Sequence, residues 1–251
     1  MDNYIKKFAH TLAETRALFF GSKLFLKDGR PTPYFVNMAM FRSGRLGLEL
    51  GSFFAGMMIA NELIDKVDII MGPSYKGSSI ALATSISLWH NHGHDLLFDY
   101  DRKEAKTHGE SSSSKSLFVN KTFFDGCRIF IVDDVATSMG TKYDLLEKID
   151  ALAREKGETY EITGVGIGID REQTTACYDE QGQLIPGKMG RDAIHDFISK
   201  SGIPVYSIAG IRDIIEYLYK TDVPVKINGA MNPLNNKTKQ EFDEYYKLYG
   251  I

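Results

Sequence analysis

Hydrophobic residues along the chain fall into short continuous runs, separated by longer segments in which they recur every three or four positions. Short runs are typical of strands buried on both faces of a sheet, and the longer spacing is typical of helices. The runs predict strands at residues 67–72, 95–100, 128–134, 161–170 and 204–210. The spaced segments predict helices at residues 2–20, 45–65, 77–93, 141–157, 190–202, 211–220 and 235–251.

Alternation of buried strands with helices predicts parallel pairing through right-handed crossovers. We therefore predict an α/β fold with a central, mostly parallel sheet flanked by helices. Residues 23–38 alternate apolar and polar side chains around a glycine and two prolines, which predicts a hairpin. The chain is expected to form a single domain. Its parts would be an N-terminal hood of helix and hairpin, an α/β core and a helical C-terminal tail, at residues 1–45, 46–220 and 221–251.

Composition places the 251-residue chain, with 43% hydrophobic and 25% charged residues, among globular proteins. A net charge of −3 argues against nucleic acid as a partner. No segment approaches the roughly 20 apolar residues that span a membrane, and the N-terminal segment lacks a signal-peptide pattern. Cys127 and Cys177 lie far apart, which argues against a disulfide framework. We expect a cytoplasmic protein with no membrane or nucleic-acid partner.

Two adjacent carboxylates, Asp133 and Asp134, end the apolar run at residues 128–134, and a loop rich in hydroxyl groups leads into the next helix. Ligands of α/β sheets bind at the carboxyl ends of the strands, and phosphates bind at helix N-termini. A sugar phosphate suits both features, because its hydroxyls donate to the carboxylates while its phosphate accepts from N–H groups. The alternative is a polar strand end without a ligand, but the loop after the pair favours binding.

Cationic side chains gather in one short segment of this slightly acidic chain: Arg102, Lys103, Lys106 and His108. A solvated charged run is the ordinary explanation of such a cluster. The glycine and four consecutive serines that follow, at residues 109 and 111–114, favour a lid over an anionic substrate instead. Tyr75 and Lys76 follow a Gly-Pro turn and could hold a pyrophosphate, although an exposed lysine in a strand-to-helix connection is the alternative.

Four stretches resemble known enzymes. "IFIVDDVATSMGT" resembles the loop that binds phosphoribosyl pyrophosphate (PRPP) in type I phosphoribosyltransferases, although "TSMGT" is one residue longer than the usual pattern. "FLKDGRPTPYFVNM", "MGPSYKGSSIA" and "DRKEAKTHGE" resemble the N-terminal hairpin, the Tyr-Lys loop and the mobile catalytic loop of orotate phosphoribosyltransferases. The matches span most of residues 25–171, and serines replace the glycines that follow the catalytic loop in the family.

This resemblance implies a transferase of pyrimidine (UMP) biosynthesis that converts orotate and PRPP to orotidine 5′-monophosphate and pyrophosphate. It implies a Mg²⁺ cofactor held mainly by PRPP and water, with Asp133 or Asp134 as candidate ligands. It also implies a homodimer in which the catalytic loop of one subunit closes over the site of its neighbour. The implied catalytic residues are Arg102, Lys103, Lys106, His108, Asp133 and Asp134.

The resemblance divides the remaining site residues between the two substrates. PRPP would be bound by the six catalytic residues together with Lys27, Tyr75, Lys76, Val135, Ala136, Thr137, Ser138, Met139, Gly140 and Thr141. Orotate would be bound by Phe35, Val36, Thr137 and Arg171. A flat pyrimidine suits an apolar wall, and an arginine suits a carboxylate because it can grip both oxygens.

Two alternatives stay open at this point. A phosphoribosyltransferase for another base would share the PRPP loop, but the catalytic loop and the Tyr-Lys loop argue against it. A non-catalytic PRPP-binding regulator of the same fold would be expected to lose the loop lysines, and Lys76, Lys103 and Lys106 are all present.

Overall fold

The computed structural model describes residues 1–103, 117–136 and 138–251. The described residues fall into two compact units that the chain enters more than once. The first unit comprises Met1–Arg42, Ile169–Ser199 and Ala209–Ile251. The second unit comprises Ser43–Gly168 and Lys200–Ile208.

The second unit contains the main sheet. Within the described residues it has five strands in the order β4-β3-β5-β6-β7, and β3 runs parallel to both β4 and β5. Ile69, Ile70 and Met71 on β3 are fully buried, as expected for a strand covered on both faces. The strands are β3 (Ile69–Gly72), β4 (Leu97–Tyr100), β5 (Cys127–Val135), β6 (Tyr160–Asp170) and β7 (Val205–Gly210). The predicted α/β fold with a mostly parallel sheet is confirmed.

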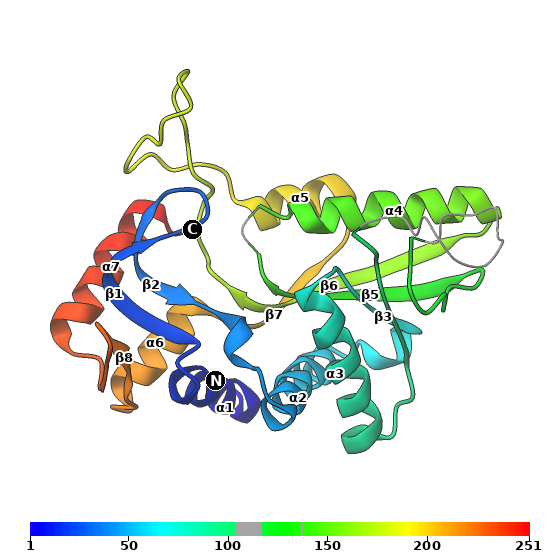
Figure 1. Ribbon diagram of the computed structural model, residues 1–251, viewed down its shortest axis with the longest axis horizontal. Coiled ribbons are helices and arrows are strands. Elements are labelled where there is room, and N and C mark those ends of the chain that lie inside the picture. The colour runs from blue at the N-terminus through cyan, green and yellow to red at the C-terminus, as the bar shows by residue number, and fades with distance from the viewer. Residues whose placement is uncertain (104–116, 137) are drawn as a thin grey trace. The chain divides into compact units, whose positions relative to one another are not determined.

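Helices cover both faces of this sheet (Figure 1). Helix α3 packs on β3, β4 and β5, and α2 packs on α3, while α4 lies on the opposite face. The contact between α2 and α3 is close, because a Cβ added to Gly51 would lie 2.2 Å from the carbonyl oxygen of Ala83. The helices are α2 (Gly44–Ala60), α3 (Lys76–His92) and α4 (Gly140–Lys156).

The first unit is built around a smaller sheet of order β2-β1-β8-β9. The predicted hairpin is present as antiparallel β1 and β2, and α7 packs against β2 (Figure 1). The Tyr34 ring lies 5.6 Å from that of Phe242 and 6.0 Å from that of Tyr245, measured between centroids. The strands are β1 (Leu18–Phe25), β2 (Pro31–Val36), β8 (Val225–Ile227) and β9 (Ala230–Asn232). The helices are α1 (Asn3–Glu14), α6 (Ile211–Lys220) and α7 (Asn236–Tyr249).

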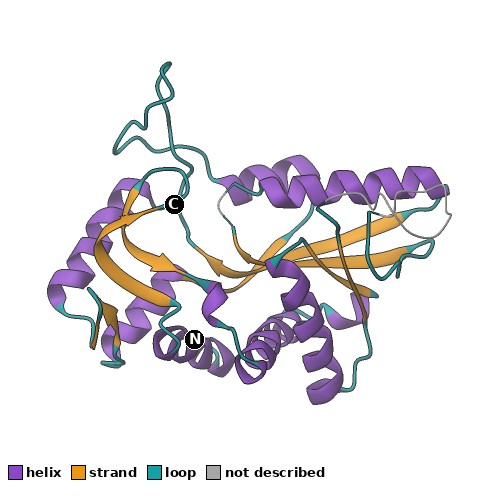
Figure 2. Ribbon diagram, in the orientation of Figure 1, coloured by secondary structure: helices purple, strands orange, loops and turns teal. Residues whose placement is uncertain are grey.

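Figure 2 shows a long loop between β6 and α5 (Ala193–Ser201), and this loop carries Arg171 at its start. An isolated bridge between Tyr178 and Leu184 ties the loop to itself. Helix α5 begins later than predicted, because the Asp192 carboxylate accepts the N–H groups of Ile194 and His195 at 3.0 Å and so caps the first turn. None of the helices formed by the described residues has the length and apolar character needed to cross a membrane.

Two predicted boundaries are wrong, the end of the first helix and the start of the hairpin, which begins at Leu18 and not at residue 23. The helix predicted at residues 2–20 ends at Glu14, and Arg16 then adopts a left-handed φ of 60°. Residues 18–20 join β1 instead, where Leu18 and Phe20 pair with Val36 and Tyr34. The alternating burial of these residues suits a sheet, and pairing with β2 satisfies backbone groups that a continued helix would have satisfied internally.

Candidate active site

The two adjacent carboxylates lie at the carboxyl end of β5 in the second unit, as the sequence predicts. The Asp133 side chain is buried and that of Asp134 is partly exposed. Each also accepts a backbone N–H close by in the chain, from Asp134 and Val135 respectively, at 2.9 Å. The arrangement therefore has a fixed geometry, but the backbone groups alone do not offset two neighbouring negative charges.

Two lysines from different elements supply the missing positive charge. Lys142 on α4 is almost completely buried, and its ammonium group donates to Asp133 Oδ2 and, at 3.5 Å, to the carbonyl oxygen of Val135. Lys76, at the start of α3, donates from Nζ to Asp134 Oδ2 at 2.6 Å and is 55% exposed. The two adjacent carboxylates thus form one buried ion pair, with Lys142, and one more exposed ion pair, with Lys76.

The loop between β3 and α3 carries Lys76 and the predicted residue Tyr75, which is 80% exposed. The peptide bond between Ser74 and Tyr75 is cis. The loop starts at Gly72, where a Cβ would lie 2.0 Å from the carbonyl oxygen of Gly77. Strand end and helix start therefore approach closely, as backbone groups must if they are to surround a pyrophosphate.

Asp101 connects this loop to the beginning of the predicted lid. Its buried carboxylate accepts the Ser74 N–H at 2.6 Å and pairs with Lys148 of α4. Arg102 follows and is half-buried, and its Nε has no hydrogen-bond partner among the described residues. Lys103 is exposed. Lys106 and His108 lie outside the described residues.

The rest of the predicted PRPP loop runs from β5 into the N-terminus of α4. Within it, Met139 has a buried side chain and a left-handed φ of 57°, an uncommon conformation for a residue with a Cβ. The loop contains half-buried Val135, buried Ala136, exposed Ser138 and, at the start of α4, exposed Gly140 and Thr141. Thr137 lies outside the described residues. The first N–H groups of α4 have no partner within the helix and form an anion-binding end.

The predicted orotate residues of the first unit come together around Arg171. Its guanidinium carbon lies 5.2 Å from the ring centroid of Tyr34 and 5.7 Å from that of Phe35. Arg171 is 5% exposed, and its Nε has no hydrogen-bond partner in the described part of the chain. An unpaired buried guanidinium nitrogen is costly unless a ligand meets it. The predicted residue Val36 is also buried and neighbours Phe35 on β2.

Burial also shapes the electrostatics around Arg171. It raises the pKa of Asp170 and of Glu172, although a backbone N–H bond opposes the rise at each carboxylate. Burial raises the pKa of the Tyr34 hydroxyl above its ordinary value. These shifts indicate a weakly solvated environment, in which an ion pair between Arg171 and a ligand carboxylate would be stronger than in water.

Lys27 is exposed in the turn between β1 and β2, in the same unit as Arg171. The turn is closed by the Gly29 N–H, which donates to the carbonyl oxygen of Leu26 at 2.9 Å. Gly29 has a φ of 83°, which a glycine adopts without strain. The turn therefore presents Lys27 to solvent with a defined backbone.

Two relatives of the chain carry the same name. A Nitrosococcus oceani protein named orotate phosphoribosyltransferase is 36% identical over 251 residues, which is 100% of this chain and 97% of that protein. The chain belongs to the orotate phosphoribosyltransferase family. A protein of the same name from Chromohalobacter salexigens is 34% identical over 215 residues, or 86% of this chain and 82% of the relative. No family model matches the chain.

Solved orotate phosphoribosyltransferases have the same fold. The crystal structure of the Francisella tularensis enzyme matches with a TM-score of 0.71 and 25% identity over 98% of both chains. A Mycobacterium tuberculosis orotate phosphoribosyltransferase, crystallised in complex with PRPP, matches with a TM-score of 0.53 and 16% identity. The match covers 84% of this chain and 98% of that one, and at this identity it shows the fold alone.

Two residues at the site of this orotate phosphoribosyltransferase family member are not among those that the sequence predicts. Lys142 and Asp101 are buried charged residues that contact predicted site residues directly. Lys142 lies among other polar residues in a helix whose pattern predicts solvent exposure. Nothing in the sequence therefore indicates that its side chain is buried. Asp101 lies directly before the cationic cluster of the predicted lid, and a carboxylate in that position could have indicated a residue of the site.

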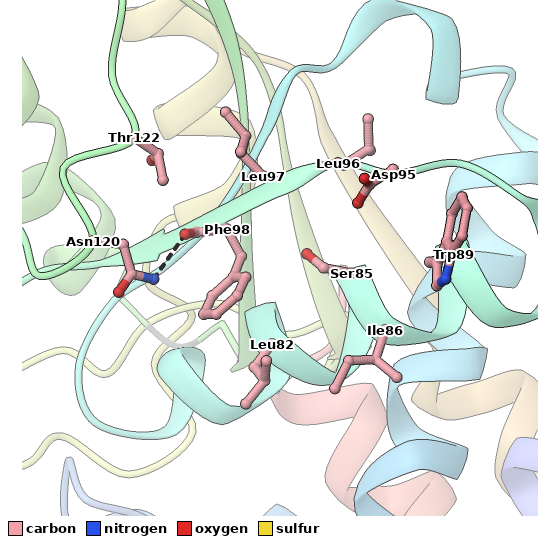
Figure 3. Close-up of a pocket in the computed structure, with 10 residues that line it drawn as sticks. All are labelled: Leu82, Ser85, Ile86, Trp89, Asp95, Leu96, Leu97, Phe98, Asn120 and Thr122. Atoms are coloured by element: carbon pink, nitrogen blue, oxygen red, sulfur yellow. Dashed lines mark hydrogen bonds between the residues drawn. The ribbon is translucent and has the colours of Figure 1, made fainter.

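An apolar groove lies elsewhere in the second unit, between α3 and β4 (Figure 3). It has a volume of about 450 Å³, and Asn120 closes one end by donating from Nδ2 to the Phe98 carbonyl oxygen at 2.9 Å. Leu82, Ile86 and Trp89 expose one face of α3 along it. None of the predicted site residues that the structure describes lines this groove, and its apolar walls do not suit a substrate with several negative charges.

Proposed function

We propose that this protein transfers the 5-phosphoribosyl group of PRPP to orotate, giving orotidine 5′-monophosphate and pyrophosphate in pyrimidine biosynthesis. The observation that carries this proposal is the 36% identity, over the whole chain, to a protein named orotate phosphoribosyltransferase. The lysine-paired carboxylates at the end of β5 support it, because a ribose with neighbouring phosphates needs hydroxyl acceptors and cations close together. Neither alternative, another base or a non-catalytic regulator, gains support from the relatives.

In the proposed reaction the anomeric carbon loses its bond to pyrophosphate, which keeps the electron pair. The ring nitrogen N1 of orotate forms the new bond to that carbon, and its proton passes to solvent. Lys76, Lys103 and Lys106 would stabilise the charge that develops on pyrophosphate. Asp134 would accept a ribose hydroxyl, and the N-terminus of α4 would hold the 5′-phosphate. Closure of the lid would exclude water, which otherwise would hydrolyse the activated sugar.

Orotate would be held by Arg171 and Phe35 of the first unit, together with Val36 and Thr137. The buried Arg171 Nε, which has no partner among the described residues, is the observation that supports a carboxylate ligand there. Arginine suits this role because its planar fork can make two parallel hydrogen bonds to one carboxylate. The Phe35 ring beside it offers an apolar face for the pyrimidine.

Mg²⁺ is the proposed cofactor. The described residues contain no group of three or more acidic, histidine or cysteine side chains that could hold a metal by themselves. Asp133 and Asp134 are both engaged by lysines, so they fit a metal bound mainly by diphosphate oxygens and water, with one carboxylate added at most. When bound, the ion would neutralise negative charge on the pyrophosphate.

We also propose a homodimer with a shared catalytic loop, located in the cytoplasm. The exposed apolar groove between α3 and β4 supports self-association, because apolar patches of this kind are typical of protein contacts. One functional domain spanning residues 1–251, with the hood, core and tail predicted from the sequence, remains part of this proposal.

The transfer activity is tested by the loss of orotate absorbance when PRPP and Mg²⁺ are added to the protein. We expect orotate to be consumed, while uracil, hypoxanthine and adenine are not converted. Conversion of another base in place of orotate would favour the first alternative. Binding of PRPP without conversion of any base would favour the regulatory alternative.

Replacing Asp134 by asparagine should weaken PRPP binding about tenfold, or about 1.4 kcal/mol. A hydrogen bond to a charged group contributes about 1.5–3 kcal/mol. The pair that Asp134 makes with exposed Lys76 contributes only about 0.2–1 kcal/mol, so freeing Lys76 offsets part of the loss. Titration calorimetry with PRPP and Mg²⁺ measures the change. Asp150→Asn on the exposed face of α4 is the control, and equal affinities of both variants would leave the carboxylate with a structural role only.

A shared lid predicts that two inactive variants complement each other. One variant, Lys103→Ala, has a defective lid, and the other, Lys76→Ala/Asp134→Ala, has a defective floor. A mixed dimer contains one site with both defects and one with neither, so random exchange should restore about a quarter of the unaltered activity. Mass spectrometry verifies the exchange. If mixed dimers form and activity does not return, each lid serves its own chain.

A further inference from the structure

The turn between β1 and β2 is held by a buried arginine that no part of the proposed reaction uses. Arg30 is 2% exposed, although arginine is rarely buried unless it is paired. Its Nε and Nη2 lie 3.0 and 2.8 Å from Asp28 Oδ2, and its own backbone N–H donates to Asp28 Oδ1 at 3.1 Å. Its carbonyl oxygen accepts the Leu26 N–H at 2.9 Å. Arg30 therefore fixes both sides of the turn that carries Lys27.

The same guanidinium reaches a second segment of the first unit. Arg30 Nη1 donates to the carbonyl oxygen of Thr174 at 2.7 Å, and Thr174 is three residues beyond Arg171. A second link runs in parallel, because the Tyr178 hydroxyl donates to the carbonyl oxygen of Asp28 at 2.8 Å. The turn with Lys27 and the segment with Arg171 are thus joined through one buried side chain and one hydroxyl.

The Thr174 carbonyl is itself held in place by residues at the end of α7. The Thr174 N–H donates to the Tyr249 carbonyl oxygen at 2.8 Å, and the Ile251 N–H donates to that of Glu172 at 3.0 Å. The Tyr249 ring centroid lies 5.2 Å from the Arg30 guanidinium carbon. Figure 1 shows the C-terminal residues beside the β1–β2 turn. Arg30 therefore joins the β1–β2 turn to the segment around Thr174, and the end of α7 fixes that segment through the Thr174 N–H.

We propose that Arg30 is a positioning residue for orotate, which fixes the segment that carries Arg171 against the β1–β2 turn so that the Arg171 guanidinium meets the orotate carboxylate. This inference rests on the proposed function, since it concerns the substrate of that site. A purely structural role would also bury Arg30, but it would affect both substrates alike. A positioning role acts on orotate first, because all the residues predicted to bind PRPP except Lys27 belong to the second unit, whereas Arg171 and Phe35 belong to the first.

Steady-state kinetics of Arg30→Met separates the two roles. We expect the KM for orotate to rise about tenfold or more, which corresponds to about 1.4 kcal/mol, while the KM for PRPP rises less than about threefold. Arg30→Lys should recover only part of the loss, because one ammonium group cannot contact Asp28 and Thr174 in the fork geometry of a guanidinium. His10→Ala is the control, since it removes the 3.0 Å contact between His10 Nε2 and the Tyr217 hydroxyl in the same unit. It should lower the melting temperature without changing the KM for orotate.

Tyr178→Phe keeps the test decisive if Arg30→Met does not fold. Tyr178 is 49% exposed, so losing its hydroxyl should leave the fold intact and raise the KM for orotate about threefold. An unchanged KM for orotate in a folded Arg30→Met or, failing that, in Tyr178→Phe overturns the proposal. Equal increases in both KM values overturn it as well. Failure of the unaltered protein to convert orotate overturns the proposed function itself, an outcome visible before any variant is made.

Discussion

Replacing Lys142 by methionine should lower the free energy of unfolding by about 3–5 kcal/mol, because it leaves the buried Asp133 carboxylate without its partner. The two side chains are 2% and 10% exposed, so little water would reach the carboxylate. Methionine fills much of the lysine volume, which limits the cavity term and makes the lost charge the main effect. Urea denaturation measures the change, and PRPP binding should weaken with it because Asp133 lies at the proposed site.

Lys156→Met on the same helix is the matched control. Its pair with Glu158 spans 3.4 Å, and the lysine is 38% exposed, so its loss should cost less than about 1 kcal/mol. A double variant, Lys142→Met/Asp133→Asn, should lose less stability than the sum of its single variants, since it removes both charges together. If Lys142→Met is as stable as Lys156→Met, the buried pair does not stabilise the fold.

Strand β5, which carries Asp133 and Asp134 near its end, could be predicted from the sequence, but the lysines that pair with these two carboxylates could not. An uninterrupted apolar run followed by two carboxylates and a hydroxyl-rich loop identifies a buried strand and its ligand-binding end. The partners depend on tertiary contacts. Lys76 is 58 positions from Asp134, and nothing local indicates that the β3–α3 loop would meet the end of β5. The sequence therefore predicts which carboxylates matter, while the fold decides which cation each one meets.

Arg30 illustrates the same limit in the first unit. An arginine in a Gly-containing turn is usually exposed, so the sequence pattern around Arg30 predicts no role for it. Its burial depends on Thr174, which is 144 positions away in the chain, and on the end of α7. The orotate residues Phe35 and Arg171 were predicted through the family resemblance, because neither an aromatic residue on a hairpin nor an arginine after a strand is specific on its own.

The β8–β9 hairpin was missed although its turn carried a signal. Asn228 and Gly229 have positive φ values of 48° and 97°, and Asn-Gly is the dipeptide that favours such two-residue turns. The flanking strands have only three residues each, too short for an alternating pattern to be recognised. Strand β8 pairs with β1, which is far away in the sequence, and β9 pairs with β8, so no local pattern indicates the sheet that they join.

Replacing Gly72 by alanine should lower both stability and turnover, because Gly72 lies where β3 meets α3 beside the proposed site. A Cβ at this position would lie 2.0 Å from the carbonyl oxygen and 2.2 Å from the carbonyl carbon of Gly77. Both are backbone atoms at the start of α3, so the strand end and the helix must move apart. Overpacking of this kind typically costs about 1–3 kcal/mol in stability. The displacement would also carry Lys76 away from Asp134, because Lys76 lies between the two glycines.

We expect turnover of Gly72→Ala to fall about a hundredfold or more, which corresponds to about 2.7 kcal/mol of lost transition-state stabilisation. Initial rates at saturating orotate and PRPP measure this, alongside urea denaturation. Gly47→Ala is the control: outside its own helix turn, none of the described residues has an atom within 4 Å of the added Cβ. An alanine inside α2 should stabilise the helix by up to about 1 kcal/mol. If Gly72→Ala turns over substrate as fast as Gly47→Ala, the close approach of β3 and α3 is not needed to place Lys76. The pyrophosphate would then have to be held by residues outside this loop.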